Sequence, residues 1–193
     1  SDPEQRMAAL LATKRMPGNE AAPILKLALR DPEDDVRLLA YSMLDQQETA
    51  INQNIERLQL RLAEQPRAPK AAHAALARWY WELAYLGLAQ GGVLEHILAQ
   101  ALLHTQAAME GGDNADLDLL AGRILMAQGQ VEEARERLQH AVELGMNTSR
   151  VAPFLAEIAF MEQRYSDVAL YLNAIPETLR NKPPLATAAR YWL

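Results

Sequence analysis

The sequence contains no cysteine among its 193 residues. This absence excludes a disulfide-stapled scaffold, thiolate metal sites and thiol catalysis. Basic residues (19) are outnumbered by acidic ones (25), which gives a formal net charge of −6 and argues against the basic face of a nucleic-acid binder. No apolar run reaches the ~20 residues of a membrane-spanning helix. No stretch is rich in strand-forming patterns either, so a helical domain with its own apolar core is favoured.

The apolar pattern is clearest between Leu119 and Gly145, where two antiparallel helices are predicted around a tight turn at Gly129. Apolar residues recur at helical spacing on both sides of this turn. Gly129 suits a helix C-terminus, because glycine adopts a left-handed backbone at little steric cost. The small residues that let the two helices approach closely are Ala121, Gly122, Ala134 and Ala141. A single hairpin of this kind cannot bury its apolar face alone and needs neighbours.

A second hairpin of the same kind is predicted over residues 155–175. When it is laid over the first, Gln163 falls on Gly129 and Leu172 on Leu138, so the offset is 34 residues (163 − 129 = 34). This period resembles that of the tetratricopeptide repeat, a helix–turn–helix unit that stacks into a superhelix. The resemblance predicts an all-α protein, an α-solenoid of helical hairpins, and it specifies a fold rather than an activity.

Capping residues and periodicity predict further helices on either side of these repeats. Pro3 opens the first of them and Pro17 ends it. The other predicted helices cover residues 22–29, 32–44, 48–64, 70–90, 93–110 and 185–193. Residues 66–69 form the clearest connector. We therefore predict an N-terminal helical part over residues 1–65 and repeats with a C-terminal capping helix over residues 70–193, joined as one continuous superhelix.

The segment over residues 29–44, LRDPEDDVRLLAYSML, is more distinctive than the repeats. Its Asp-Pro-x-x-Asp-Val-Arg core, from Asp31 to Arg37, is similar to the turn and second helix of HEAT repeats. In that family the Asp caps the helix and the Arg reaches along the stack to a neighbour's turn. Together with the helices and repeats behind it, this HEAT-like part resembles the PelE family, the inner-membrane component of the bacterial Pel exopolysaccharide machinery.

The resemblance to PelE implies a scaffold with no catalytic motif. Members of that family carry membrane-spanning segments ahead of a cytoplasmic helical-repeat region, which implies a location on the cytoplasmic face of the bacterial inner membrane. The implied partners are the cyclic-di-GMP receptor PelD, the glycosyltransferase PelF and the transporter PelG. Because the chain opens on Ser1 rather than Met and ends within an apolar pattern, we expect it to be a piece of a longer protein.

No constellation of catalytic or metal-binding residues emerges from the pattern. The histidines lie on different predicted helices and none has a second histidine one turn away; they are His73, His96, His104 and His140. The acidic residues near the start of the helix after Gly129 alternate with arginines, as on a solvated helix face. No Gly-rich phosphate loop or nucleophile elbow is present. We therefore expect no enzyme activity, cofactor, metal ion, small-molecule ligand or direct membrane contact from this segment.

The first helix of each tetratricopeptide hairpin lines a concave groove, which suggests a wall for a protein partner. The residues that this register places on the wall are Arg78, Trp81, Tyr85, Leu88, Asp116, Leu119, Arg123, Met126, Arg150, Glu157, Phe160 and Met161. Aromatic residues and arginine anchor many interfaces, and methionine adapts to irregular partners. Trp79 and Tyr80 are expected instead to fill the seam with the N-terminal part, an alternative that stays open for Trp81 and Tyr85.

These observations favour a protein-interaction scaffold that assembles a membrane-associated exopolysaccharide synthesis and secretion complex. The alternative with the same fold is a helical-repeat adaptor in another bacterial envelope-assembly or regulatory complex. An enzyme acting on a saccharide is disfavoured, because no paired carboxylates fall at positions that the fold would bring together.

Overall fold

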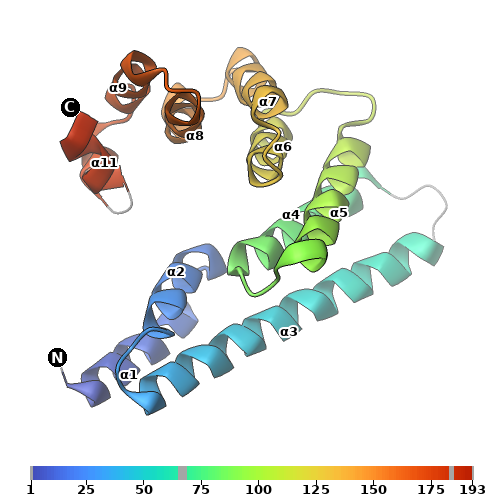
Figure 1. Cartoon of the computed structure of the whole chain (residues 1–193). Coiled ribbons are helices and arrows are strands. Elements are labelled where there is room, and N and C mark those ends of the chain that lie inside the picture. The colour runs from blue at the N-terminus through green and yellow to red at the C-terminus, as the bar shows by residue number, and fades with distance from the viewer. Residues whose placement is uncertain (1, 65–68, 183–184, 193) are drawn as a thin grey trace. The chain divides into compact units, whose positions relative to one another are not determined.

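The computed structural model describes residues 2–64, 69–182 and 185–192, and every regular element in these ranges is a helix. The elements are α1 (Pro3–Ala12), the 3-10 turn η1 (Thr13–Arg15), α2 (Gly18–Ala28), α3 (Asp34–Glu64), α4 (Lys70–Leu86), α5 (Gly91–Met109), α6 (Ala115–Ala127), α7 (Val131–Glu143), α8 (Thr148–Met161), α9 (Tyr165–Asn173), α10 (Glu177–Arg180) and α11 (Leu185–Trp192) (Figure 1). The prediction of an all-α fold is therefore confirmed.

The chain divides into two compact units, residues Ser1–His104 and Thr105–Leu193, with the division inside α5. Each unit has its own set of buried apolar side chains. Of the connector predicted at residues 66–69, only Pro69 lies within the described part of the chain. The predicted division at this connector and the single continuous superhelix stay predictions.

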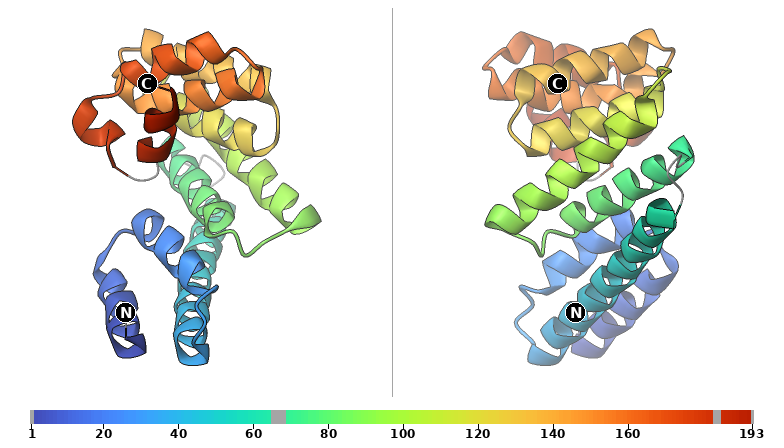
Figure 2. Two further views of the ribbon diagram at one scale, coloured as in Figure 1. Left: turned by 60° about the vertical axis from the view of Figure 1, so that its left-hand side comes forward. Right: turned by 90° about the vertical axis from the view of Figure 1, so that its right-hand side faces the viewer.

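The prediction of separate helices over residues 32–44 and 48–64 is wrong, because α3 is one helix of 31 residues. Figures 1 and 2 show it running without a break. The sequence between Asp34 and Glu64 contains neither Gly nor Pro, so nothing in it stops a helix at Asp45. Residues such as Leu44 and Ile51 keep an apolar face buried across the predicted break.

The helix that begins at Lys70 ends earlier than predicted. It ends at Leu86 rather than at residue 90, because Gly87 takes a left-handed backbone with φ 70° and closes α4 there. Lys26 on α2 reaches this end, and its Nζ donates a hydrogen bond of 2.6 Å to the Tyr85 carbonyl. Burial lowers the pKa of Lys26. Its cation lies at the negative end of the α4 dipole, where positive charge is favourable.

The HEAT-like turn before α3 is held by charge. Asp31 accepts a hydrogen bond of 3.0 Å from the Glu33 backbone N–H. Because α3 begins only at Asp34, this bond braces the turn before the helix, and Asp31 does not cap α3 itself. Arg37 does not reach a neighbouring turn, because its Nη1 donates to the carbonyls of Asp31 and Pro32 in its own turn. Arg6 on α1 makes the longer-range contact, with Nε and Nη2 at 2.8 and 2.9 Å from the two Asp31 carboxylate oxygens.

The hairpin of α6 and α7 has the close helix contact that its small residues predict. Ala121, Ala134 and Ala141 are buried. Gly122 faces α7 so closely that a Cβ there would lie 2.7 Å from Leu138 Cγ and 3.3 Å from the Ala134 carbonyl oxygen. Glycine at this position therefore lets the two helices pack without a clash.

The turns at Gly129 and Gln163 are equivalent, as the 34-residue offset predicts. Both have a left-handed backbone, with φ 77° and 60°. In each turn the following residue donates back to a carbonyl five positions earlier, Gln130 to Leu125 at 2.9 Å and Arg164 to Ala159 at 2.8 Å. This is the hydrogen-bond pattern of a Schellman helix end. The two hairpins α6–α7 and α8–α9 are therefore repeats of one motif.

The two hairpins of the second unit are joined by charge as well as by apolar packing. Arg135 on α7 pairs with Glu132 on its own helix and with Glu162 at the end of α8. Within the first hairpin, Asp118 is fully buried and pairs with Arg137 Nη1 at 3.2 Å and His140 Nδ1 at 2.8 Å. A buried carboxylate of this kind is tolerated only when it is paired.

The core of the second hairpin is covered at its end by α11. The buried residues of this core are Ala152, Ala156, Ala159, Val168, Leu172 and Ile175. Leu185 and Trp192 of α11 pack against them. Among the described residues, no helix is both long and apolar enough to cross a membrane.

We expect Gly122→Ala to lower the free energy of unfolding by about 1–3 kcal/mol, because the new Cβ overlaps Leu138. Chemical denaturation followed by circular dichroism measures this loss. Gly92→Ala is the matched control, since Gly92 lies in α5 and nothing is within 4 Å of a Cβ built on it. That variant should be neutral or more stable by up to ~1 kcal/mol. Equal effects of the two substitutions would contradict the close packing of α6 on α7.

We also expect acid to weaken the N-terminal turn. The hydrogen bonds from Arg6, followed by the bond from the Glu33 N–H, hold the pKa of Asp31 below its usual range. Its contribution to stability is therefore fully present above the unfolded-state pKa of about 3.9 and is lost as the pH falls through the folded-state value. Thermal unfolding between pH 5 and pH 3 should show a smaller pH dependence in Asp31→Asn than in the wild type. Asp35→Asn, which changes an exposed acid nearby, should keep the wild-type dependence.

Candidate partner-binding surfaces

The predicted wall residues of the first unit lie on α4 and in the turn after it. Arg78 is exposed, and Trp81, Tyr85 and Leu88 are half-buried. The Trp81 and Tyr85 rings are 6.4 Å apart, and the Lys26 ammonium lies 5.3 Å from the centre of the Tyr85 ring. Part of the Tyr85 ring is thus engaged inside the unit, and Arg78 is the exposed side chain of this group.

Of the two aromatic residues expected to fill a seam, Tyr80 is the better buried. It is 7% exposed, whereas Trp79 is half-buried. The Tyr80 hydroxyl accepts a hydrogen bond of 2.7 Å from Gln59 Nε2 on α3. Tyr80 therefore belongs to the packing of α4 on α3, as the sequence predicts.

The structure brings together several of the predicted wall residues on α6 and α8. Asp116 on α6 pairs with Arg150 on α8 at 3.1 Å. The Arg123 guanidinium lies 5.3 Å from the centre of the Phe154 ring, a residue that the register did not include. Met126 is half-buried, but Leu119 is only 9% exposed and contributes mainly to the core. Arg123 and Arg150 are thus each held by a side chain of the adjacent hairpin.

The remaining wall residues lie toward the end of α8 and are open. Glu157, Phe160 and Met161 are all exposed, Phe160 by 54% and Met161 by 50%. Whether all twelve predicted residues form one wall stays a prediction, because they belong to two separate units.

Phe160 is part of a cluster of aromatic rings in the second unit, which we call the aromatic hollow. It is a cavity of about 890 Å³ lined by Phe160, Tyr165, Thr187, Ala188, Tyr191 and Trp192. The Tyr165 and Trp192 rings stack at 5.4 Å, and Phe160 meets Trp192 edge to face at 6.1 Å. Tyr191 is 80% exposed. Aromatic rings held open in this way are the side chains that most often anchor a partner.

The sequence register identified Phe160 but missed Tyr165, Tyr191 and Trp192. Tyr165 stands just after the left-handed turn at Gln163, and the other two stand on α11, outside any complete repeat. The available signal was the presence of three aromatic residues near a hairpin turn and the chain end in a protein with only 6% aromatics. Their meeting depends on how α11 packs, which periodicity does not describe.

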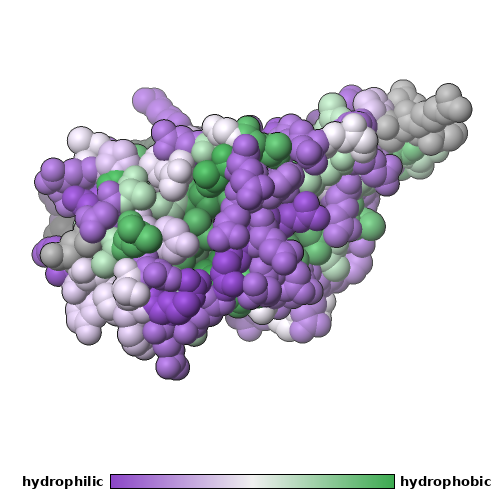
Figure 3. Space-filling view, turned by 90° about the horizontal axis from the view of Figure 1, so that it is seen from above, coloured by the Kyte–Doolittle hydropathy of each residue, from purple (hydrophilic) through white to green (hydrophobic). Residues whose placement is uncertain are grey.

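The aromatic hollow can be compared with the composition of the rest of the exposed surface. On the face drawn in Figure 3, hydrophilic side chains predominate and hydrophobic ones form small separate groups. Scattered single apolar residues are normal on any protein surface, so a group of exposed aromatic rings in contact with one another is distinctive.

Two of the four histidines meet inside the first unit. His73 on α4 and His104 on α5 have their Nδ1 atoms 2.9 Å apart, so one ring donates and the other, neutral at that nitrogen, accepts. The Tyr80 ring stacks on His104 at 5.8 Å. Burial, followed by the charge of His73, lowers the pKa of His104. Within the described ranges, no group of three or more His, Cys, Asp or Glu residues is placed to hold a metal ion.

Comparison with known proteins supports the helical-repeat class. Residues 96–158 match the family model described as Tetratricopeptide repeat. No curated protein matches the chain. The crystal structure of TTC0263, a thermophilic TPR protein of Thermus thermophilus, is similar with a TM-score of 0.60 and 22% identity, covering 96% of this chain and 94% of that one. The fold class is thus an all-α solenoid of tetratricopeptide type. Such folds generally mediate binding between proteins and are typically not enzymes.

We expect the histidine pair to make the first unit sensitive to mild acid. Because the pKa of His104 is lowered on folding, protonation of this side chain favours the unfolded state. The contribution of the neutral His104 to stability is fully present above the unfolded-state pKa of about 6.5 and is lost as the pH falls below it. The thermal midpoint should therefore fall between pH 7.5 and pH 5.5, and it should fall less in His104→Asn. The control is His96→Asn, an exposed histidine on the same helix. A wild-type response in His104→Asn would rule out this origin.

Proposed function

We propose that this chain is a protein-interaction scaffold whose second unit binds a partner through the aromatic hollow. The observation that carries this proposal is the group of open rings on the last repeat hairpin and α11. Rings at these positions are pre-arranged by their mutual contacts, so little side-chain entropy remains to be lost on binding. Among the described residues, no charged side chain lines the hollow, which suits an apolar or aromatic anchor from another protein.

We further propose that the complex is the Pel exopolysaccharide synthesis and secretion machinery, on the cytoplasmic face of the bacterial inner membrane. The support is the resemblance of residues 30–44 to the PelE family, followed by tetratricopeptide-type hairpins in the second unit. The candidate partners are PelD, PelF and PelG. A role as an adaptor in another envelope-assembly or regulatory complex is the alternative that the same fold allows.

The proposal is tested by capture of PelD, PelF and PelG, one at a time, with the chain as bait. We expect at least one to be retained, and the double substitution Phe160→Ala with Tyr191→Ala to weaken binding at least tenfold. The physical reason is that truncating a central aromatic anchor commonly costs about 2 kcal/mol or more, which is about thirtyfold in affinity. Surface plasmon resonance with the retained partner measures the change.

Leu170→Ala is the matched control for this experiment. Leu170 is an apolar residue on α9 that is 65% exposed and does not line the hollow. It should leave binding within twofold of the wild type. Retention of none of the three partners would refute the Pel assignment and favour the alternative adaptor. Retention that the double substitution does not change would refute the role of the aromatic hollow.

A further inference from the structure

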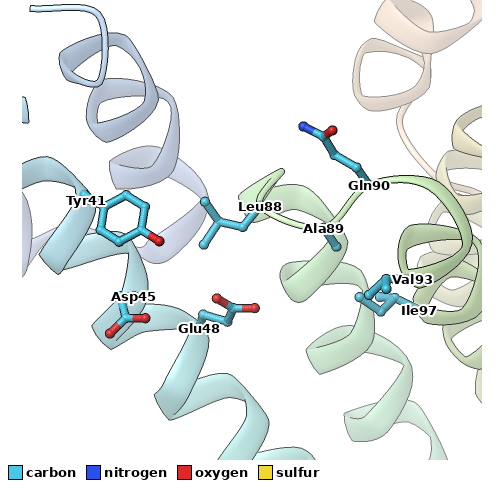
Figure 4. A pocket seen from close by; sticks show the side chains of 8 residues that line it. All are labelled: Tyr41, Asp45, Glu48, Leu88, Ala89, Gln90, Val93 and Ile97. Carbon is cyan, nitrogen blue, oxygen red and sulfur yellow. The ribbon is translucent and has the colours of Figure 1, made fainter.

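A second hollow, of about 430 Å³, lies within the first unit and shares no residue with the aromatic hollow (Figure 4). We call it the acidic hollow. Three side chains reach it from the first half of α3, and the rest come from the turn between α4 and α5 and from α5 itself. Its lining residues are Tyr41, Asp45, Glu48, Leu88, Ala89, Gln90, Val93 and Ile97. Its volume is in the range of about 300–1,000 Å³ that is usual for binding sites.

One side of the acidic hollow carries negative charge without a counter-charge. Asp45 and Glu48 are three residues apart and so share one face of α3. The ion-paired acids described in this unit are Asp31, with Arg6, and Asp34, with Arg37. Among the described residues, neither Asp45 nor Glu48 forms an ion pair. The electrostatic field of this pair is therefore available to a ligand from outside.

The other side of the acidic hollow is apolar. Leu88, Ala89, Val93 and Ile97 carry no charge, and Val93 is 64% exposed. Tyr41 stands one turn before Asp45 on α3 and is 61% exposed. Figure 4 shows Tyr41, Asp45 and Glu48 on the α3 side and the apolar side chains across from them. A ligand that fits both sides combines an apolar part with a positive charge.

We propose that the acidic hollow receives an arginine side chain from a basic segment of a partner protein. The methylene stem of the arginine covers Leu88 and Val93, as long cationic side chains do along apolar surface. Its guanidinium reaches Asp45 and Glu48 with charge-assisted hydrogen bonds. The Tyr41 ring offers its face to the same cation. The inference rests on the scaffold function and deepens it by naming the chemistry of one contact.

Arginine satisfies this hollow better than other ligands do. Its planar guanidinium has five donors and can serve two carboxylates, whereas a lysine ammonium is a compact point charge. Phosphate groups and nucleic acids are repelled by the negative charges of Asp45 and Glu48. A calcium ion takes six to eight oxygen ligands, which two carboxylates beside an apolar wall do not supply. A wholly apolar ligand would leave both carboxylates without partners in a partly desolvated site.

The test uses the full chain, labelled with ¹⁵N, and a capped peptide, acetyl-Gly-Leu-Arg-Leu-Gly-amide, in NMR titrations at low ionic strength. We expect the NMR signals of the backbone amides of Leu88, Gln90 and Val93 to shift when the peptide binds. The same peptide with citrulline in place of arginine keeps the shape and loses the charge, so it should bind at least tenfold more weakly. Raising the salt concentration should weaken the binding of the arginine peptide, because exposed charge pairs are screened.

The double substitution Asp45→Asn with Glu48→Gln should lower the affinity for the arginine peptide at least tenfold. The circular dichroism spectrum and the thermal midpoint should be unchanged. Glu56→Gln, an exposed acid further along α3 that does not line the hollow, is the matched control and should bind as the wild type does. Equal binding of the citrulline peptide, wild-type affinity in the double variant, or shifts confined to other residues would each overturn the proposal. Equal binding of a lysine peptide would overturn the choice of arginine. Because no Pel component takes part, this test fails or succeeds independently of the partner capture.

Discussion

The second unit depends on a left-handed backbone residue at the turn of each hairpin. At Gly129 this conformation costs little, whereas at Gln163 it costs on the order of 1 kcal/mol, since the side chain crowds the backbone. The strain is tolerated because the returning helix buries Val168 and Leu172 against α8. The turn at Gly129 likewise brings the small residues of α6 and α7 together, so that Gly122 lies against Leu138. The repeat is therefore a consequence of turn geometry and side-chain size acting together.

The two units use charge in different ways. In the first unit, charged groups fasten helix ends: Arg6 holds the Asp31 turn, and Lys26 reaches the carbonyl of Tyr85 at the end of α4. In the second unit, charge also lies inside the packing, since Asp118 is fully buried between α6 and α7. Removing one of the charged groups of the first unit chiefly loosens a turn. Removing a partner of Asp118, in contrast, leaves a carboxylate unpaired inside the core of a hairpin.

A protein built from stacked hairpins encloses little space, so its function comes from the faces that packing leaves open. The two hollows illustrate this in opposite ways. The aromatic hollow presents rings such as Phe160 and Trp192 with no charge among its described lining residues, whereas the acidic hollow sets Asp45 and Glu48 against an apolar wall. A scaffold with two such different surfaces has the means to distinguish partners by chemistry as well as by shape.

The sequence by itself determined the all-α class, the 34-residue repeat and the contact of small residues at Gly122, because each of these follows from local spacing and side-chain size. It also assigned Phe160 to a groove wall, which stays a prediction, although the side chain is exposed. Only the tertiary structure decided that His73 meets His104, that Trp192 stacks on Tyr165, and that two hollows form. These contacts join side chains on different helices, α4 with α5 and α9 with α11 in the two ring contacts. Periodicity states which face of a helix is apolar, but the path of the connecting turns decides which face of another helix it meets.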